Sequence, residues 1–162
     1  MKKYKLTDET KDFLGITLHR IVCVTAFANV SAGDLGGWVE SEKNLSQDGD
    51  AWVSDKARVS GNARVYGDAR VSGDAWVSGN ARVSGDARVY GDAWVYGNAR
   101  VYDNAWVYGN ARVSGDARVS GDACVYGDAL VEIILLDVYE VLPCTVEAAK
   151  SIMEVTPYEP NN

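Results

Sequence analysis

A six-residue repeat through the middle of the chain limits what it can fold into. Between residues 50 and 132 every sixth residue is a valine, from Val53 to Val131, and an alanine stands two positions before each valine. Successive side chains of a strand point to opposite faces, so the alanine and valine of a unit such as Ala-Arg-Val-Ser share one face. The Gly-Asp or Gly-Asn pair that follows breaks the strand, because glycine readily adopts positive φ and Asp or Asn tolerates it. Each hexad is therefore predicted to be a short strand followed by a corner.

The same period excludes a helix and predicts an all-β solenoid. Six residues do not match a period of 3.6, and the glycine found in most hexads would cost a helix about 1 kcal/mol each time. Three hexads make one triangular coil of 18 residues, and stacked coils would lie about 4.8 Å apart, joined by parallel ladders. Residues 50–132 would then form about four and a half coils, a rod roughly 20 Å long.

Both ends of such a solenoid need a cap, because an open end exposes core and unpaired backbone. Residues 1–49 are predicted to form an N-terminal β cap and an irregular first coil. The irregularity lies between Leu45 and Val53, which are eight residues apart instead of six. Residues 133–162 are predicted to form a C-terminal cap or tail, with a strand and then a short helix that begins after Thr145.

An apolar run at the start of the tail has two interpretations. Four consecutive aliphatic side chains cannot all face a narrow core, and they are Ile133, Ile134, Leu135 and Leu136. They form either a capping strand beneath the helix or an oligomer interface, since an exposed apolar patch usually marks a contact. A homo-oligomer is therefore left open.

Charge and hydropathy narrow the range of partners and locations. The chain has 16 basic and 23 acidic residues, a formal charge of −7, which argues against a generic nucleic-acid partner. The first residues lack the apolar segment of a secretory signal, and the longest aliphatic run is far too short to cross a bilayer. These features predict a cytoplasmic protein with no membrane contact.

Two resemblances support the solenoid. The hexads "VSGDAR", "VYGNAR" and "VYGDAW" resemble those of the hexapeptide-repeat proteins, which implies a left-handed parallel β-helix, a handedness that the spacing alone does not give. The segment "GDLGGWVESEKNLSQDGDAWV" (33–53) and the hexads after it resemble a set of small phage and prophage hexapeptide-repeat proteins, over roughly residues 15–131. The second resemblance implies that the cytoplasm concerned is that of a bacterial host.

The residues needed for the best-known chemistry of this fold are missing from their expected place. Resemblance to the hexapeptide acyltransferases implies a trimer with a catalytic histidine between subunits and a loop extruded from the coils. This chain has one histidine, His19, in the predicted cap, and no loop interrupts residues 50–132. A zinc site of three histidines, as in the carbonic anhydrases of this fold, cannot be built. We therefore expect no catalytic residues, metal or cofactor, and a protein that is not an enzyme.

The residues free to vary face outward, and stacking them by 18 gives columns. Trp, Tyr and Arg dominate binding hot spots, so the first candidate binding wall is the pair of neighbouring columns richest in them. Its residues are Trp76, Trp94, Tyr96, Arg58 and Arg112. A ladder of arginines is the second candidate, formed by Arg64, Arg82, Arg100 and Arg118. The alternative is a solvated surface in which corner carboxylates such as Asp68 and Asp86 neutralise the arginines.

Together these observations predict a non-enzymatic, phage-type β-solenoid that binds a protein partner, in the setting of a host interaction or of a counter-defence inhibitor. Two alternatives stay open. One is a purely structural or oligomerising rod, and the other is a catalytically degenerate relative of the acyltransferases.

Overall fold

The computed structural model describes residues 1–132 of the 162-residue chain. Within them lie seventeen β-strands and one 3₁₀ helix. The strand and helix expected in the tail, and the apolar run Ile133–Leu136 with its expected interface, lie outside the described residues. Residues 1–132 contain no helix with the length and apolar character that crossing a bilayer requires.

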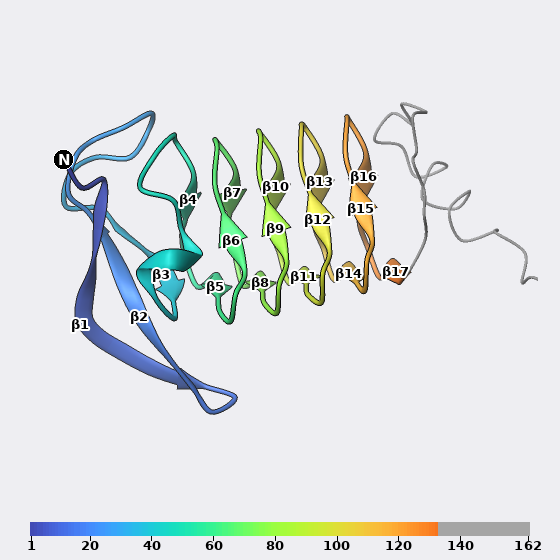
Figure 1. The fold of residues 1–162 in the computed structure, drawn as a ribbon, viewed down its shortest axis with the longest axis horizontal. Helices are drawn as coiled ribbons and strands as arrows, with labels where there is room; N and C mark the ends of the chain where they lie inside the picture. The colour runs from blue at the N-terminus through green and yellow to red at the C-terminus, as the bar shows by residue number, and fades with distance from the viewer. Residues whose placement is uncertain (133–162) are drawn as a thin grey trace, which may run out of the picture.

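The N-terminal region forms a hairpin attached to one wall of the solenoid. Strands β1 (Tyr4–Phe13) and β2 (Ile16–Cys23) pair antiparallel, and β2 pairs antiparallel with β3 (Leu35–Val39). Strand β3 then pairs in parallel with the first coil, so the hairpin covers the N-terminal edge of that wall. Figure 1 shows the hairpin at the blue end of the stacked coils.

The coils form three parallel sheets, which we name after their outward residues. The tryptophan wall comprises β5 (Arg58–Val59), β8 (Trp76–Val77), β11 (Trp94–Val95), β14 (Arg112–Ser114) and β17 (Leu130–Glu132). The tyrosine wall comprises β4 (Trp52–Val53), β7 (Arg70–Val71), β10 (Arg88–Val89), β13 (Trp106–Val107) and β16 (Cys124–Val125). The arginine wall comprises β6 (Arg64–Val65), β9 (Arg82–Val83), β12 (Arg100–Val101) and β15 (Arg118–Val119).

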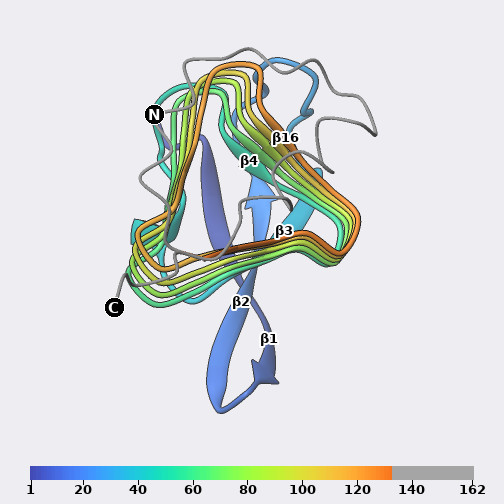
Figure 2. The same cartoon turned by 90° about the vertical axis from the view of Figure 1, so that its right-hand side faces the viewer.

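The pairing register confirms the predicted coil. Val59 pairs with Val77 on the tryptophan wall, and each further ladder between strands β4 to β17 also joins residues 18 positions apart. Figure 2 looks along the solenoid from its C-terminal end. In that view the chain runs clockwise from the tyrosine wall to the tryptophan wall and then to the arginine wall while it advances toward the viewer, which is a left-handed coil.

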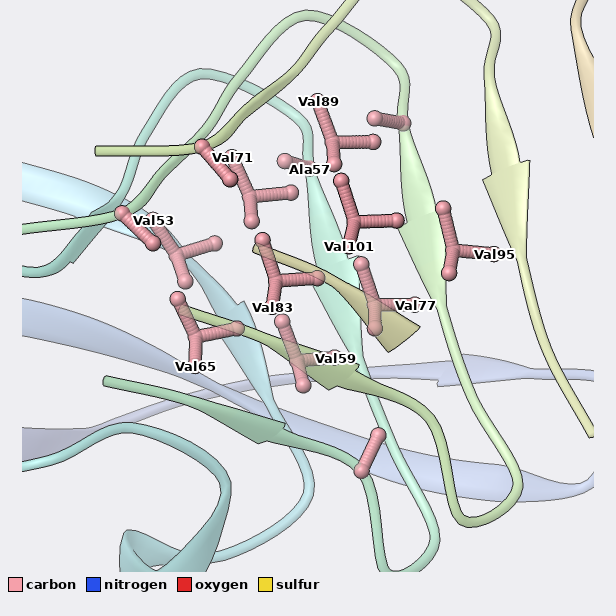
Figure 3. Close-up of a cluster of buried hydrophobic side chains, with 14 of the residues drawn as sticks. Val53, Ala57, Val59, Val65, Val71, Val77, Val83, Val89, Val95 and Val101 are labelled. Carbon is pink, nitrogen blue, oxygen red and sulfur yellow. The ribbon is translucent and has the colours of Figure 1, made fainter. Parts of the chain in front are cut away.

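The interior of the rod is a stack of valines and alanines. From Ala51 to Ala117, no repeat valine or alanine is more than 1% exposed. Figure 3 shows the valines of successive coils lying over one another along the core. Burying a valine side chain stabilises a fold by about 1.5–3 kcal/mol, so this column supplies most of the driving force for stacking.

Glycine at the corners is required both by backbone conformation and by space. Gly73 has a φ of +68°, and a Cβ there would lie 2.9 Å from the backbone nitrogen of Gly91 in the next coil. Asp55 and Asp103 hold the same corner position with φ of 57° and 60°. Each uses its carboxylate to accept a hydrogen bond from the glycine N–H one coil further on, which offsets the conformational cost.

Polar contacts fill the eight-residue interval between Leu45 and Val53. The 3₁₀ helix η1 (Glu42–Asn44) precedes Leu45, which forms a β-bridge with Val65. Asn44 is fully buried and donates its amide hydrogens to the carbonyls of Gly61 and Ala63. Within the interval, the backbone N–H groups of Ser46 and Ala51 donate to the carbonyls of Val65 and Gly67, so the interval follows the first regular coil.

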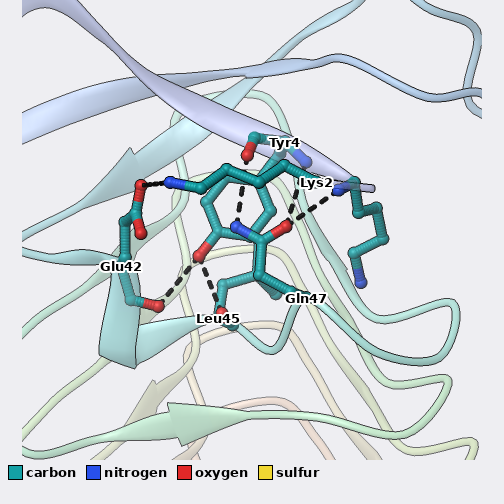
Figure 4. A network of polar contacts seen from close by, with 6 residues as sticks. Lys2, Tyr4, Glu42, Leu45 and Gln47 are labelled. Carbon is teal, nitrogen blue, oxygen red and sulfur yellow. Dashed lines mark hydrogen bonds and ion pairs between the residues drawn. The ribbon is translucent and has the colours of Figure 1, made fainter.

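Strand β1 closes this end of the rod (Figure 4). The buried Tyr4 hydroxyl lies 2.9 Å from the carbonyl of Glu42 and 2.7 Å from that of Leu45. The Gln47 side-chain oxygen accepts from the backbone N–H groups of Lys3 and Tyr4, and Lys2 forms an ion pair with Glu42. Burial raises the pKa of Tyr4 above its ordinary value, which keeps its hydroxyl protonated and able to donate.

Candidate functional site

The column of the first candidate wall assembles as predicted, but the chain covers half of it. Strand pairing places Arg58, Trp76, Trp94 and Arg112 in register along the tryptophan wall. The register of β1 and β2 shifts between Leu6 and Thr10, and beyond the shift the hairpin passes beneath β5 (Figure 1). The far end of β1 therefore lies against the outer face of this wall.

Ring contacts show how closely the end of β1 packs against the tryptophan wall. The ring of Phe13 meets that of Trp76 edge-on at 5.0 Å, and the guanidinium of Arg58 lies 4.2 Å from the Phe13 centroid. The Arg58 guanidinium also donates to the carbonyl of Asp74, and Trp76 Nε1 donates to the Ser60 hydroxyl. Arg58 and Trp76 are therefore half-buried and stabilise the packing of the hairpin, while their role in binding stays a prediction.

The other half of the patch lies farther along the tryptophan wall, toward its C-terminal strands. Trp94 meets Trp76 edge-on at 5.2 Å, and the exposed Arg112 places its guanidinium 5.2 Å from the Trp94 centroid. Tyr96 stands in the neighbouring column and is half-buried. Their role in binding stays a prediction.

The tyrosine wall carries a hollow that the sequence argument did not identify. Its second outward column changes from small to large side chains along the rod, as Ser54, Ser72, Tyr90, Tyr108 and Tyr126. The step leaves a hollow of about 600 Å³, lined by Asn29, Ser54, Arg70, Ser72, Arg88, Tyr90 and Trp106. The sequence contains a signal for this hollow: Ser72 and Tyr90 are 18 positions apart in one column, and an arginine stands two positions before each of them.

Stacking holds the aromatic end of this hollow in place. The rings of Tyr90 and Tyr108 lie 5.0 Å apart and 2° from parallel, and Tyr108 stacks on Tyr126 in the same way. The Arg88 guanidinium lies 5.2 Å from the ring centroid of Trp106, which is 36% exposed and meets Tyr90 edge-on. Burial, and then the neighbouring Tyr108, raise the pKa of Tyr90 above its ordinary value. The hollow is therefore lined by the packed rings of Tyr90 and Trp106 at one end and by the arginines Arg70 and Arg88.

The arginine ladder exists, but the corner carboxylates of the alternative interpretation do not form ion pairs with it. Strand pairing stacks Arg64, Arg82, Arg100 and Arg118, and all four are exposed. Within residues 1–132 the ion pairs are Lys2–Glu42 and Arg20–Glu9, so neither Asp68 nor Asp86 pairs with the ladder. Asp68 instead accepts a hydrogen bond from the backbone N–H of Asp50.

Beside the ladder, alternating side chains form a notch. The adjoining column runs Tyr66, Ser84, Tyr102 and Ser120, so a serine lies between two tyrosines. A hollow of about 280 Å³ lies there, lined by Tyr66, Arg82, Ser84, Gly85, Arg100, Tyr102, Asp103 and Arg118. A second hollow, of about 610 Å³, lies on the other side of Tyr66 and reaches Arg64 and the η1 region.

The residues of acyl-transfer or metal chemistry do not come together in the described part of the chain. His19 lies in β2, half-buried, opposite Thr10 and Val39 on the flanking strands. Among residues 1–132, no group of three or more His, Cys, Asp or Glu side chains is placed to hold a metal ion.

Comparison with known proteins gives two matches. A family model described as "YdcK Beta solenoid repeat" matches residues 57–73, 63–79, 81–97, 93–109, 105–121 and 111–127. The "Uncharacterized acetyltransferase YdcK" of Escherichia coli (strain K12) is 33% identical over 64 residues, which cover 35% of this chain. The alignment spans 20% of the E. coli protein's length. These repeat matches and the stacked 18-residue coils show that the chain contains a β-solenoid built from hexapeptide repeats.

Proposed function

We propose that this protein is a non-enzymatic β-solenoid that binds a protein partner through the hollow on the tyrosine wall. The observation that carries the proposal is the arrangement of Arg88, Tyr90 and Trp106 around a space of about 600 Å³. Tryptophan, tyrosine and arginine are the residues most enriched among binding hot spots, and hot spots cluster in well-packed pockets. A partner side chain would enter the hollow and pack on Tyr90 and Trp106, with Arg70 and Arg88 beneath it.

The solenoid favours binding because it fixes the side chains of Tyr90 and Trp106 in position before the partner binds. Tyr90 is stacked on Tyr108, and Trp106 lies against Arg88, so both rings have little freedom left to lose. Ordering a side chain on association costs about 0.5–1.5 kcal/mol, a cost that preorganised side chains largely avoid.

The proposed setting is an interaction with a bacterial host protein, in which the solenoid acts as a host-interaction factor or a counter-defence inhibitor. This part of the proposal comes from the resemblance of residues 15–131 to phage and prophage proteins. Under this proposal the partner is a protein of the host cytoplasm.

Matched pairs of substitutions test the proposal. Tyr90→Ser with Trp106→Arg would remove the aromatic end of the hollow, and both new residues already occur in the same columns of neighbouring coils. Tyr96→Ser with Trp94→Arg makes the same two changes at equivalent slots of the tryptophan wall. Affinity capture from a bacterial lysate should recover a protein with the wild type and the second variant but not with the first.

The same experiment separates the competing sites. Loss of the captured protein only with the second variant would move the site to the tryptophan wall. An identical set from all three proteins would favour a structural rod.

An acyltransferase-like activity is the second candidate function, because the E. coli relative carries an acetyltransferase name. Acetyl-coenzyme A should leave the melting temperature of this protein unchanged if it is a binding module. A concentration-dependent rise would support the enzyme instead.

A further inference from the structure

The arginine wall carries a line of positive charge in which no arginine forms an ion pair with a carboxylate of residues 1–132. Arg64, Arg82, Arg100 and Arg118 stand on adjacent coils, and the ladder spans about 14 Å at the usual spacing of strands. No carboxylate of residues 1–132 lies within 4.0 Å of any of them. Adjacent guanidinium groups repel one another, so an anion placed between them would relieve that repulsion as it binds.

The flanks of the ladder limit the width of this positive strip. The preceding corner carries Asn62, Asn80 and Asn98, whose side chains hydrogen-bond in sequence and end on Asp116. The following corner carries Asp68, Asp86, Asn104 and Asp122. The strip is therefore one column wide, between an amide ladder and an acidic edge. Such a strip suits a narrow row of carboxylates, whereas the acidic edge and the charge of −7 oppose a nucleic-acid backbone.

The notch beside the ladder gives one carboxylate a defined seat. Ser84 forms its floor, Tyr66 and Tyr102 stand on either side, and Arg82, Arg100 and Arg118 line it. Asp103 also lines the notch, but its carboxylate accepts a hydrogen bond from the backbone N–H of Gly121. Guanidinium groups and hydroxyls are the donors that bind carboxylates in proteins, and arginine does so through paired hydrogen bonds.

We propose that the arginine wall binds an acidic segment of a partner protein, with one carboxylate seated in the notch at Ser84. The remaining acidic side chains lie along the ladder and pair with successive arginines. This site is on a different wall from the hollow at Tyr90 and Trp106, so either proposal can fail without the other.

Defined probes on the full chain test this inference. A fluorescein-labelled octaglutamate peptide should bind at low ionic strength with an anisotropy change that salt reverses, while octaglutamine should not bind. Arg82→Gln with Arg100→Gln should weaken octaglutamate binding at least tenfold. The control, Arg70→Gln with Arg88→Gln, removes the same charge from equivalent slots of the tyrosine wall and should keep the affinity within twofold.

A third variant tests the notch without changing the charge. Ser84→Tyr introduces a residue that the same column already holds at Tyr66 and Tyr102, and it should weaken octaglutamate binding severalfold by filling the seat. Three results would overturn the inference: no octaglutamate binding at low salt, an equal loss in both arginine pairs, or full binding by Ser84→Tyr. Tighter, ladder-dependent binding of an eight-nucleotide oligothymidylate would overturn it as well, by assigning the wall to phosphodiesters.

Discussion

Phe13 lies edge-on against Trp76, with ring centroids 5.0 Å apart and planes at 90°, although 63 positions separate them in the sequence. The contact ties the far end of the N-terminal hairpin to the tryptophan wall. Arg58 lies between these elements with its guanidinium 4.2 Å from the Phe13 centroid. Phe13 thus fixes the projecting end of a hairpin whose other end is joined to the rod by strand pairing.

Phe13→Ala should therefore release the end of the hairpin. An aromatic pair contributes about 0.5–1.5 kcal/mol and a cation–π contact a similar amount, so the free energy of local opening should fall by about 1–2 kcal/mol. Hydrogen exchange of the β1 amides near Phe13 should speed up accordingly. Leu14→Ala is the control, because Leu14 is 73% exposed and its loss should leave exchange unchanged. Unchanged exchange in Phe13→Ala would show that backbone pairing alone holds the hairpin.

Val83→Ala should destabilise the middle of the rod. Val83 is fully buried, and removing its two methyl groups loses burial and leaves a cavity between coils, at a cost of about 2 kcal/mol. The midpoint of denaturant unfolding should fall. Ser84→Ala, at the half-buried outward neighbour, should shift it much less. Equal shifts would mean that the valine column does not dominate stability.

Two glycine substitutions should separate backbone strain from crowding. Gly73→Ala places a Cβ 2.9 Å from the Gly91 nitrogen and keeps a positive φ, whereas Gly121→Ala has a φ of +62° and its Cβ meets no atom of residues 1–132 within 4 Å. A left-handed alanine costs about 1–2 kcal/mol. Gly121→Ala should show that cost alone, and Gly73→Ala should show a larger loss of unfolding free energy. A smaller effect for Gly73→Ala would mean that the coils can separate slightly without penalty.

Tyr90 should ionise above the ordinary tyrosine pKa. Burial and then Tyr108 raise its pKa, because both disfavour the phenolate in the folded protein. The folded state then holds this proton longer than the unfolded chain, so stability is retained below the unfolded pKa and falls as pH rises through the folded pKa. Ring NMR shifts of labelled tyrosine should show this, and Tyr108→Ser should lower the pKa of Tyr90. A Tyr90 pKa at its ordinary value in the wild type would contradict the stacked geometry.

Residues that obey the repeat could be predicted from the sequence, because their environment recurs. The buried valines and alanines, the corner glycines and the outward columns all follow from a period of six and a coil of 18. The hairpin packing of Phe13 on Trp76 could not be predicted, since it depends on a register shift in a strand outside the repeat. The pairing of Asp68 with arginine was wrong because its carboxylate bonds to a nearby backbone N–H, which needs no long side chain to be ordered.

The eight-residue interval between Leu45 and Val53 has a consequence for how the chain finds one structure. Sliding the coils by six residues would leave every valine in the core, yet it would move Trp106 and the arginines to different walls. The uniform interior therefore cannot choose among such arrangements. The N-terminal region distinguishes them, because Phe13 packs on Trp76, and a slide by six residues would replace that tryptophan with an arginine. The irregular N-terminal region, and not the uniform repeat, thus determines which side chains each later coil presents on each wall.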